Sequence, residues 1–440
     1  MASSRPMPSV DSTAGDRFVI EGGHPIGGDV TPSGNKNEAL PLLAASLLAA
    51  GSVVIENVPR IRDVTTLIEL LRALGVRVDW SGEHAVEVDA GRLRDSRPDA
   101  ALAAEIRASF LLAAPLLART GLAVLPRPGG DKIGRRRLDT HLLALRQLGA
   151  RITTDDAYYH LELSGRFRGA EVFLDEASVT GTETAVMAAA MAEGRTRLLN
   201  AASEPHVQGL CHALNAMGAR ITGIGSNVLE IDGVGELHPA RHRVGPDHIE
   251  VGSFVAVAAM TGGELRVRDV APDHLRMIRM VFARLGVETL IEGAALRVPA
   301  AQKRAIVADV DGAIPKVDDA PWPGFPADLT PLALVLATQC DGTVLIHEKL
   351  FESRLFFVDS LIMMGARIVL CDPHRALVIG PSRLHGATIV SPDIRAGMAL
   401  IAAALAAHGR SVIRNVQQVD RGYERVEERL RSLGARISRE

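Results

Sequence analysis

A sixfold repeat constrains this chain more than any other feature of its sequence. A Leu/Met-Gly-Ala/Val step occurs six times, at intervals of 68 to 79 residues. The glycines of the six steps are Gly75, Gly149, Gly218, Gly286, Gly365 and Gly434. Similarity at a regular spacing indicates repeated structural units that stack or pack on one another. The sequence therefore predicts six copies of one small unit.

Each copy has the same predicted order: an apolar helix, a glycine, a strand and an amphipathic second helix. The apolar helices are predicted at 37–50, 105–120, 182–193, 250–261, 329–341 and 394–408. They stop at Gly51, Gly121, Gly194, Gly262, Gly342 and Gly409. Glycine adopts the left-handed conformation after a helix without steric strain. Strands rich in β-branched residues follow at 52–55, 122–125, 196–199, 264–267, 343–346 and 411–413.

The apolar helices carry few polar positions on any face, so we expect them to be buried on all sides. The second helices, such as 67–73 and 426–432, alternate apolar and charged residues as surface helices do. One buried and one exposed helix against strands predicts an α/β fold with an internal helical layer. Because the sixth copy ends without further strands, we expect segments 18–20 and 28–31 to complete it. Residues 1–17 would form a disordered tail, 35–245 one three-unit domain, and 18–34 with 246–440 the other.

Composition excludes several classes of partner. The net charge of −3 gives no sign of a nucleic-acid-binding surface, and no apolar run reaches the ~18–20 residues of a membrane span. The three cysteines are scattered and lack metal-ligand spacing, which favours a reducing compartment. We therefore expect a cytoplasmic protein without metal, cofactor, nucleic acid or membrane.

The starts of the predicted buried helices are unusually polar. Six helix N-termini that pointed towards one cleft would create positive potential there, and ligands bearing phosphate would suit it. A capping role is the simpler explanation at each single start, and Asp328 and Asp393 suit an N-cap. A loop with two glycines, 128–132, is a candidate mobile flap, although an ordinary exposed turn explains it equally.

The motifs at these places resemble those of the enolpyruvyl transferases over residues 18–437. They are SGNKNEALP at 33–41, NVPRIRDV at 57–64, IRAS at 106–109, PGG with IG-R at 128–136, PGFPADL at 323–329, FESR at 351–354, DIRA at 393–396 and DRGYER at 420–425. The resemblance implies a two-domain inside-out α/β barrel with three units per domain and an active site in the cleft between them.

The resemblance also implies an activity: transfer of enolpyruvyl from phosphoenolpyruvate to the 3′-hydroxyl of UDP-N-acetylglucosamine, with release of phosphate. Asp131 would protonate the substrate, Asp328 would be the general base, and Lys36 would assist. The implied phosphoenolpyruvate contacts are Lys36, Asn37, Arg136, Arg354, Arg395 and Arg421. Glu352 and Asp393 would orient ligands or arginines.

The implied contacts with the UDP-sugar are Asn37, Arg107, Arg136, Leu138, Asp139, His141, Ser178, Val179, Thr180, Asp328 and Leu350. His141 suits a structural histidine equally well. Three positions depart from the usual pattern, namely Glu176 for a lysine, Thr180 for a glycine and Arg137 for a proline. Arg137 would supply the positive charge that is lost at Glu176.

Asp131 is a further departure, because most relatives carry cysteine there. That cysteine is alkylated by the epoxide fosfomycin, whereas aspartate reacts poorly with an epoxide, so we expect an active, fosfomycin-insensitive enzyme. Two alternatives remain open: enolpyruvyl transfer to another nucleotide such as UMP, and a non-catalytic UDP-sugar-binding regulator. The shikimate-pathway relatives fit less well, because their Gly-Asn-Ala-Gly-Thr segment is absent here.

Overall fold

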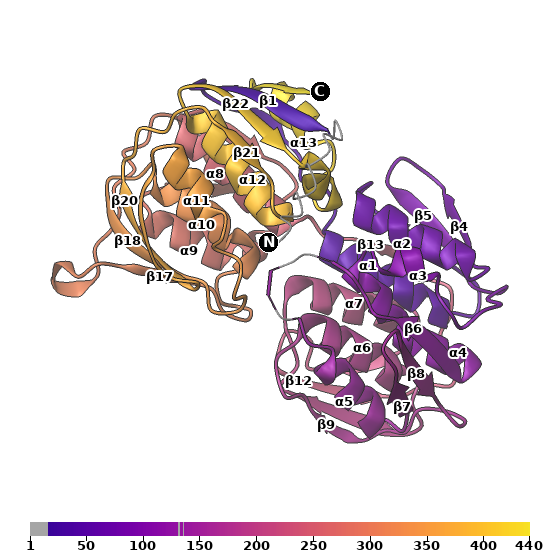
Figure 1. The fold of residues 1–440 in the computed structure, drawn as a ribbon. Helices are drawn as coiled ribbons and strands as arrows, with labels where there is room; N and C mark the ends of the chain where they lie inside the picture. The colour runs from indigo at the N-terminus through magenta and orange to yellow at the C-terminus, as the bar shows by residue number, and fades with distance from the viewer. Residues whose placement is uncertain (1–15, 131–132, 135) are drawn as a thin grey trace, which may run out of the picture.

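The repeated units each fold as a small sheet packed against a buried helix. The structure is a computed structural model that describes residues 16–130, 133–134 and 136–440. In this part of the chain the buried helices are α1 (Lys36–Ala45), α4 (Ala113–Thr120), α6 (Val179–Ala190), α8 (His248–Thr261), α10 (Thr330–Ala337) and α12 (Ile394–Ala406). Figure 1 shows them inside two lobes, with the strands on the outside.

Three of the predicted buried helices are not continuous. The segment 37–50 ends as a 3₁₀ turn, η1 (Ser46–Leu48), after α1. The segments 105–120 and 329–341 begin with η2 (Arg107–Leu112) and η5 (Ala327–Leu329). Pro115 lies in the first turns of α4 and Pro331 near the start of α10. Because proline lacks an N–H donor, it suits the beginning of an α-helix and accounts for these later starts.

The second helices cover the outside of the units. They are α2 (Arg62–Ala73), α5 (Asp139–Gln147), α7 (Pro205–Ala216), α9 (Arg276–Arg284), α11 (Val358–Met363) and α13 (Val426–Ser432). Shorter helical segments are α3 (Ala100–Ala103), η3 (Pro272–Leu275), η4 (Val310–Gly312) and η6 (Val416–Arg421). These outer helices bury one side and expose the other, as their alternating sequences predict.

The first lobe contains three sheets among the described residues. In strand order they are β13 (Arg241–Arg243), β3 (Ser52–Glu56), β5 (Ala85–Asp89), β4 (Arg77–Trp80); β6 (Leu122–Pro126), β8 (Tyr158–Glu162), β7 (Arg151–Thr154); and β11 (Arg220–Thr222), β12 (Val228–Asp232), β10 (Arg195–Leu199), β9 (Glu171–Phe173). One hydrophobic core, from Ala39 to Val244, fills this lobe.

The second lobe has the same construction, also with three described sheets. They are β15 (Leu290–Glu292), β16 (Ala295–Val298), β14 (Leu265–Val267), β2 (Gly28–Val30); β17 (Lys316–Asp318), β18 (Gly342–His347), β20 (Arg375–Gly380), β19 (Arg367–Asp372); and β21 (Thr388–Val390), β22 (Gly409–Arg414), β1 (Arg17–Gly22), β23 (Arg436–Arg439). A second core combines Phe18–Val30 with residues from Ile249 to Ile437. We refer to the lobes as the first and second domains; the bounds given above for them stay predictions.

The N-terminal segment is divided between two units. Strand β1 inserts between β22 and β23, so it completes the sixth unit. Strand β2 pairs in parallel with β14 in the fourth unit instead, so the prediction for 28–31 was wrong. Strand β13 reciprocally pairs with β3 in the first unit. At each crossing, the strand before the crossing belongs to one domain and the helix after it belongs to the other. The two pairs are β2 followed by α1, and β13 followed by α8.

The two chain crossings lie side by side and are hydrogen-bonded to each other. The N–H of Asn35 donates to the carbonyl of Gly245 at 2.8 Å, and that of Asp247 donates to Ser33 at 2.9 Å. Helices α1 and α8 begin immediately after these contacts. The crossing therefore places the starts of two buried helices next to each other between the domains.

The glycines that follow the buried helices have the predicted backbone conformation only in part. All six have positive φ, but only Gly121 and Gly262 are the left-handed residues that cap their helices.

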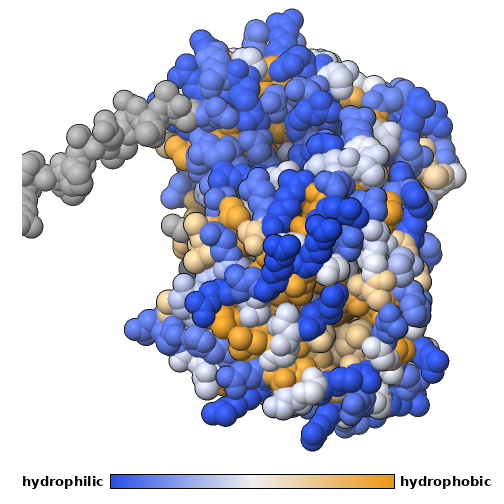
Figure 2. Space-filling view, turned by 90° about the vertical axis from the view of Figure 1, so that its right-hand side faces the viewer, coloured by the Kyte–Doolittle hydropathy of each residue, from blue (hydrophilic) through white to orange (hydrophobic). Residues whose placement is uncertain are grey.

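Figure 2 shows a surface on which hydrophilic residues predominate and apolar residues form separate patches. No helix in the described ranges has the length and apolarity needed to cross a membrane.

Candidate active site

A cleft of about 510 Å³ lies between the two domains. Its walls include the starts of the buried helices and the loops that follow the strands. The predicted site residues that line it are Lys36, Asn37, Arg107, Arg136, Ser178, Val179, Thr180, Asp328, Leu350, Arg354, Arg395 and Arg421. The structure thus brings together residues from five helix starts and three loops. Asp131 lies outside the described residues.

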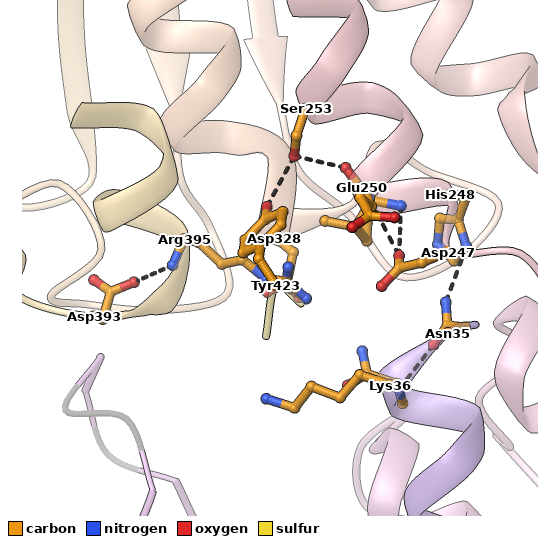
Figure 3. Close-up of polar contacts among 12 residues, drawn as sticks. Asn35, Lys36, Asp247, His248, Glu250, Ser253, Asp328, Asp393, Arg395 and Tyr423 are labelled. Atoms are coloured by element: carbon orange, nitrogen blue, oxygen red, sulfur yellow. Dashed lines mark hydrogen bonds and ion pairs between the residues drawn. The ribbon is translucent and has the colours of Figure 1, made fainter. Parts of the chain in front are cut away.

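Side chains at the helix starts have local roles that position their neighbours. The Asn35 side chain caps α1 by accepting from the N–H groups of Asn37 and Glu38. Asp393 caps α12 by accepting from the N–H groups of Arg395 and Ala396. These caps fix the first turns from which Lys36 and Arg395 reach towards the cleft (Figure 3). Asp393 itself is buried behind the cleft wall.

Asp328 does not cap a helix and instead binds two buried arginines. Its Oδ1 lies 3.0 Å from Nη2 of Arg354, and its Oδ2 lies 2.9 Å from Nε of Arg395. Burial alone would raise the pKa of Asp328, but the charges of Arg395, Arg354 and then Lys36 hold it well below its usual range. Asp328 is therefore a carboxylate with its negative charge firmly stabilised.

Asp63 is a second carboxylate that binds two cations of the cleft, and the sequence analysis did not single it out. Its Oδ2 lies 2.7 Å from Nζ of Lys36, and its Oδ1 lies 2.9 Å from Nε of Arg421. Burial acts to raise the pKa of Asp63, but Lys36 and Arg421 outweigh it and lower the pKa. Asp63 lies within the motif at 57–64, but an acidic residue in the first turn of a helix has a sufficient local explanation. Only the long-range contact with Arg421 shows that Asp63 belongs to the site.

Two further arginines, Arg107 and Arg136, line the cleft. Burial and then the charge of Arg136 lower the pKa of Arg107 to about 10, so Arg107 remains protonated at neutral pH. Nη2 of Arg107 donates to the carbonyl of Arg137 at 2.7 Å. The Arg137 side chain forms ion pairs with Asp139 and Asp175, and it also lines the cleft near Glu176.

Several residues predicted to contact the nucleotide lie beside the cleft without lining it. His141 is buried, its Nε2 lies 2.8 Å from Oγ1 of Thr180, and its ring packs edge-on against Phe110. Burial and the charge of Arg107 lower the pKa of His141 to about 3, so its imidazole is neutral. His141 therefore supports Thr180 as a structural residue. Leu138 is buried and Asp139 is exposed at the start of α5, outside the cleft lining.

Glu352 contacts the residues that directly follow the candidate flap. A Cβ on Gly134 would come within 2.1 Å of Oε2 of Glu352, so the two lie in direct contact. The N–H of the next residue, Ser353, donates to the carbonyl of Ile133 at 3.2 Å. The FESR loop of the second domain thus packs on the segment that follows the flap in the first.

Comparison with known proteins assigns this architecture to a class. The family model of EPSP synthase (3-phosphoshikimate 1-carboxyvinyltransferase) matches residues 20–430. The chain therefore belongs to this family of enolpyruvyl transferases. Twelve of the predicted site residues, those named above as lining residues, lie in the cleft between its two domains.

Relatives within the family carry one particular name. A protein of Treponema denticola is 54% identical over 96% of this chain and 98% of its own length. A protein of Bradyrhizobium diazoefficiens is 55% identical over the same shares. Both are named UDP-N-acetylglucosamine 1-carboxyvinyltransferase, as is a 49% identical protein of Bacteroides thetaiotaomicron.

Solved structures have the same fold. The enolpyruvyl transferase NikO from Streptomyces tendae superposes with a TM-score of 0.85 and is 27% identical, covering 97% of this chain and 99% of its own. EPSP synthase from Acinetobacter baumannii gives a TM-score of 0.74 at 19% identity, covering 97% of this chain and 100% of its own. These likenesses confirm the predicted α/β fold.

Proposed function

We propose that this chain transfers the enolpyruvyl group of phosphoenolpyruvate to the 3′-hydroxyl of UDP-N-acetylglucosamine and releases phosphate. Relatives of nearly equal length and about half identical sequence carry the name of that reaction. The observation that carries the proposal is the cleft itself. It combines the partly exposed carboxylate of Asp328 with a set of cations suited to an acceptor and a donor that are both anionic.

The cations of the cleft would bind phosphoenolpyruvate. Its phosphate and carboxylate carry negative charge that Lys36, Arg136 and Arg421 would neutralise. Arg354 and Arg395 would share the charge of the bound anion with Asp328. Because those two arginines keep the pKa of Asp328 low, redirecting them towards the substrate would raise that pKa and make the carboxylate a stronger base.

The reaction would proceed by addition followed by elimination. Asp328 would take the proton of the sugar hydroxyl while the hydroxyl oxygen attacks C2 of phosphoenolpyruvate. A proton delivered to C3 completes the addition and leaves a tetrahedral phospho-ketal. Loss of a proton from C3 then expels phosphate and restores the double bond. Asp131 would deliver the proton to C3 if closure of a dry site raised its pKa.

The biological role that follows is the first committed step of peptidoglycan synthesis, and hence of cell-wall biogenesis, cell shape and division. We place the reaction in the cytoplasm. The free thiols Cys211, Cys340 and Cys371 support a reducing compartment.

Release of phosphate from phosphoenolpyruvate tests the proposal. We expect release by the purified protein only when UDP-N-acetylglucosamine is present. Release with UMP but not with the UDP-sugar would select a different acceptor and contradict the proposal. Binding of the UDP-sugar without any release would make the chain a regulator.

Inactivation by fosfomycin tests the proposed role of Asp131. We expect the wild type to keep its activity after incubation with fosfomycin, because a carboxylate is a poor nucleophile towards the epoxide. The variant Asp131→Cys should be inactivated irreversibly. The expected insensitivity to fosfomycin would be refuted if the drug inactivated the wild type irreversibly and Asp131→Ala abolished this inactivation.

A further inference from the structure

One wall of the cleft is polar but lacks the arginine and lysine side chains found elsewhere in it. We call it the neutral wall, and its members are Glu183, Glu204, His206, His248 and Trp322. Glu183 lies on α6, while Glu204 and His206 flank the start of α7. His248 begins α8, where it lies beside Asn35 in Figure 3. Neither the motifs nor the family resemblance singled out these residues.

Burial drives the ionisable groups of the neutral wall towards their uncharged forms. Glu183 is 1% exposed, and burial followed by the neighbouring Glu204 raises its pKa well above the ordinary value. Burial lowers the pKa of His206 to about 4 and that of His248 to about 3. Both imidazoles are therefore neutral at pH 7, and Glu183 favours its protonated form, which can donate a hydrogen bond.

Polar atoms of this wall lack partners within the described part of the chain. They are Oε1 of Glu183, Oε2 of Glu204 and Nδ1 of His206. Glu183 and His206 are more than nine-tenths buried, and both line the cleft. Buried polar atoms in proteins are nearly always hydrogen-bonded, so these two side chains are candidates for contact with a ligand.

The aromatic members hold this wall in place. The rings of His206 and His248 stack with centroids 6.4 Å apart and an interplanar angle of 6°. The His248 ring lies 6.0 Å from that of Trp322, and the backbone N–H of Trp322 donates to Oε1 of Glu204 at 3.4 Å. Since His206 belongs to the first domain and His248 and Trp322 to the second, the two domains build the wall together.

The neutral wall lies between the two places that we assign to the ends of the acceptor, its diphosphate and its reacting hydroxyl. The diphosphate would lie at Val179 and Thr180, which the resemblance implies as contacts of the UDP-sugar. These residues precede Glu183 by one helical turn and share its side of α6. At the other end, the charge of Asp328 acts on both His206 and His248. A nucleotide sugar with its diphosphate at the first place and its reacting hydroxyl at the second must run its sugar along this wall.

We infer that Glu183 and His206 are specificity residues that hydrogen-bond the uncharged substituents of the acceptor's sugar. This inference rests on the proposed function and names the part of the acceptor that the site reads. Hydroxyl and amide groups match uncharged donors and acceptors, whereas phosphoenolpyruvate matches the cations opposite. A site that hydrogen-bonds a substrate group discriminates strongly against ligands that lack it.

Steady-state kinetics of two variants test the inference. Glu183→Met and His206→Phe keep the approximate volume and remove the hydrogen bonds. We expect each to raise KM for UDP-N-acetylglucosamine by about 10- to 100-fold. The kcat and the KM for phosphoenolpyruvate should stay within about threefold of the wild type. Glu183→Gln, which keeps a donor and an acceptor, should restore most of the affinity. His212→Ala, exposed on the same helix α7, is the matched control.

Failure of this inference is distinct from failure of the proposed function. Without phosphate release by the wild type in the presence of UDP-N-acetylglucosamine, the proposed function itself is wrong. In an active wild type, unchanged KM for the UDP-sugar in both variants, or a rise only in KM for phosphoenolpyruvate, overturns the inference. Should either variant fail to fold, His206→Gln decides. It moves the hydrogen-bonding atoms, so the ratio of kcat/KM for the UDP-sugar and for its 4′-epimer must change by about fivefold or more; an unchanged ratio overturns the inference.

Discussion

Asp63 and Asp328 are two carboxylates that each bind two cations of the same cleft. Asp63 binds Lys36 of the first domain and Arg421 of the second, so its ion pairs connect the domains. Asp328 binds Arg354 and Arg395, which belong to its own domain. The pKa of both carboxyls is lowered, because the cations outweigh burial. The electrostatic environment alone therefore does not tell a base from a counterion.

Accessibility separates the two carboxylates. The Asp328 side chain is 27% exposed, whereas that of Asp63 is 7% exposed. A general base must come within hydrogen-bonding reach of the proton that it removes. We therefore propose that Asp328 is the base and that Asp63 positions Lys36 and Arg421. The difference teaches that a lowered pKa in this cleft shows only that cations are close to the carboxylate. The exposure of the carboxylate indicates whether it can reach a substrate.

Removal of the accessible carboxylate should have the largest effect. Asp328→Ala takes away the base, so we expect kcat to fall by about 10²- to 10⁴-fold. Binding of the UDP-sugar, measured by calorimetry, should remain largely intact because the other proposed contacts with this substrate remain. Normal turnover of this variant would remove Asp328 from the role of base.

Removal of the enclosed carboxylate should affect substrate binding rather than chemistry. In Asp63→Asn the ammonium of Lys36 and the guanidinium of Arg421 lose the group that fixes them. We expect kcat/KM for phosphoenolpyruvate to fall by about 10- to 100-fold, since misplaced binding groups reduce productive orientation. An unchanged KM for phosphoenolpyruvate together with a collapsed kcat would instead place Asp63 in the chemical step.

A third carboxyl group, Glu348, sharpens the comparison because its pKa moves in the opposite direction. It is fully buried, and burial followed by the nearby Asp319 raises its pKa to about 9, despite Arg354. A raised pKa in the folded state stabilises the fold at low pH, and that contribution is lost as pH rises from Glu348's ordinary value towards 9.

Glu348→Gln should therefore change the pH dependence of stability. We expect urea denaturation near pH 8.5 to give the variant a higher free energy of unfolding than the wild type. The difference should be at least about 1.4 kcal/mol, the equivalent of one unit of pKa. Near pH 5 the two proteins should differ little. A wild type whose stability does not fall between these pH values would contradict the assignment.

The fold was largely predictable because its information is local and repeated. Periodic apolar helices, glycine stops and β-branched strands recur six times, so errors in one copy are corrected by the others. The division of the N-terminal segment was predictable only in part. The missing strands of the sixth copy predicted the place of β1 beside β22. Strand β2 carries no sequence signal for its partner β14, because that pairing depends on contacts more than two hundred residues away.

The site was predictable where residues belong to motifs at helix starts, as with Lys36, Asp328 and Arg395. His141 lies near the right place, but its contact with Thr180 shows that it supports the cleft wall. Asp63 and His206 were missed, because each has an ordinary explanation at the start of a helix. Only the juxtaposition of two domains reveals what their side chains face.

The most direct test of the division of labour is one titration of phosphate release against phosphoenolpyruvate for Asp63→Asn and Asp328→Ala, at saturating UDP-N-acetylglucosamine. We predict that the Asp63→Asn curve shifts to higher concentration and approaches the plateau of the wild type. The Asp328→Ala curve should have a collapsed plateau at little-changed half-saturation. The reverse pattern, with a lost plateau for Asp63→Asn and a shifted but intact one for Asp328→Ala, would contradict the account.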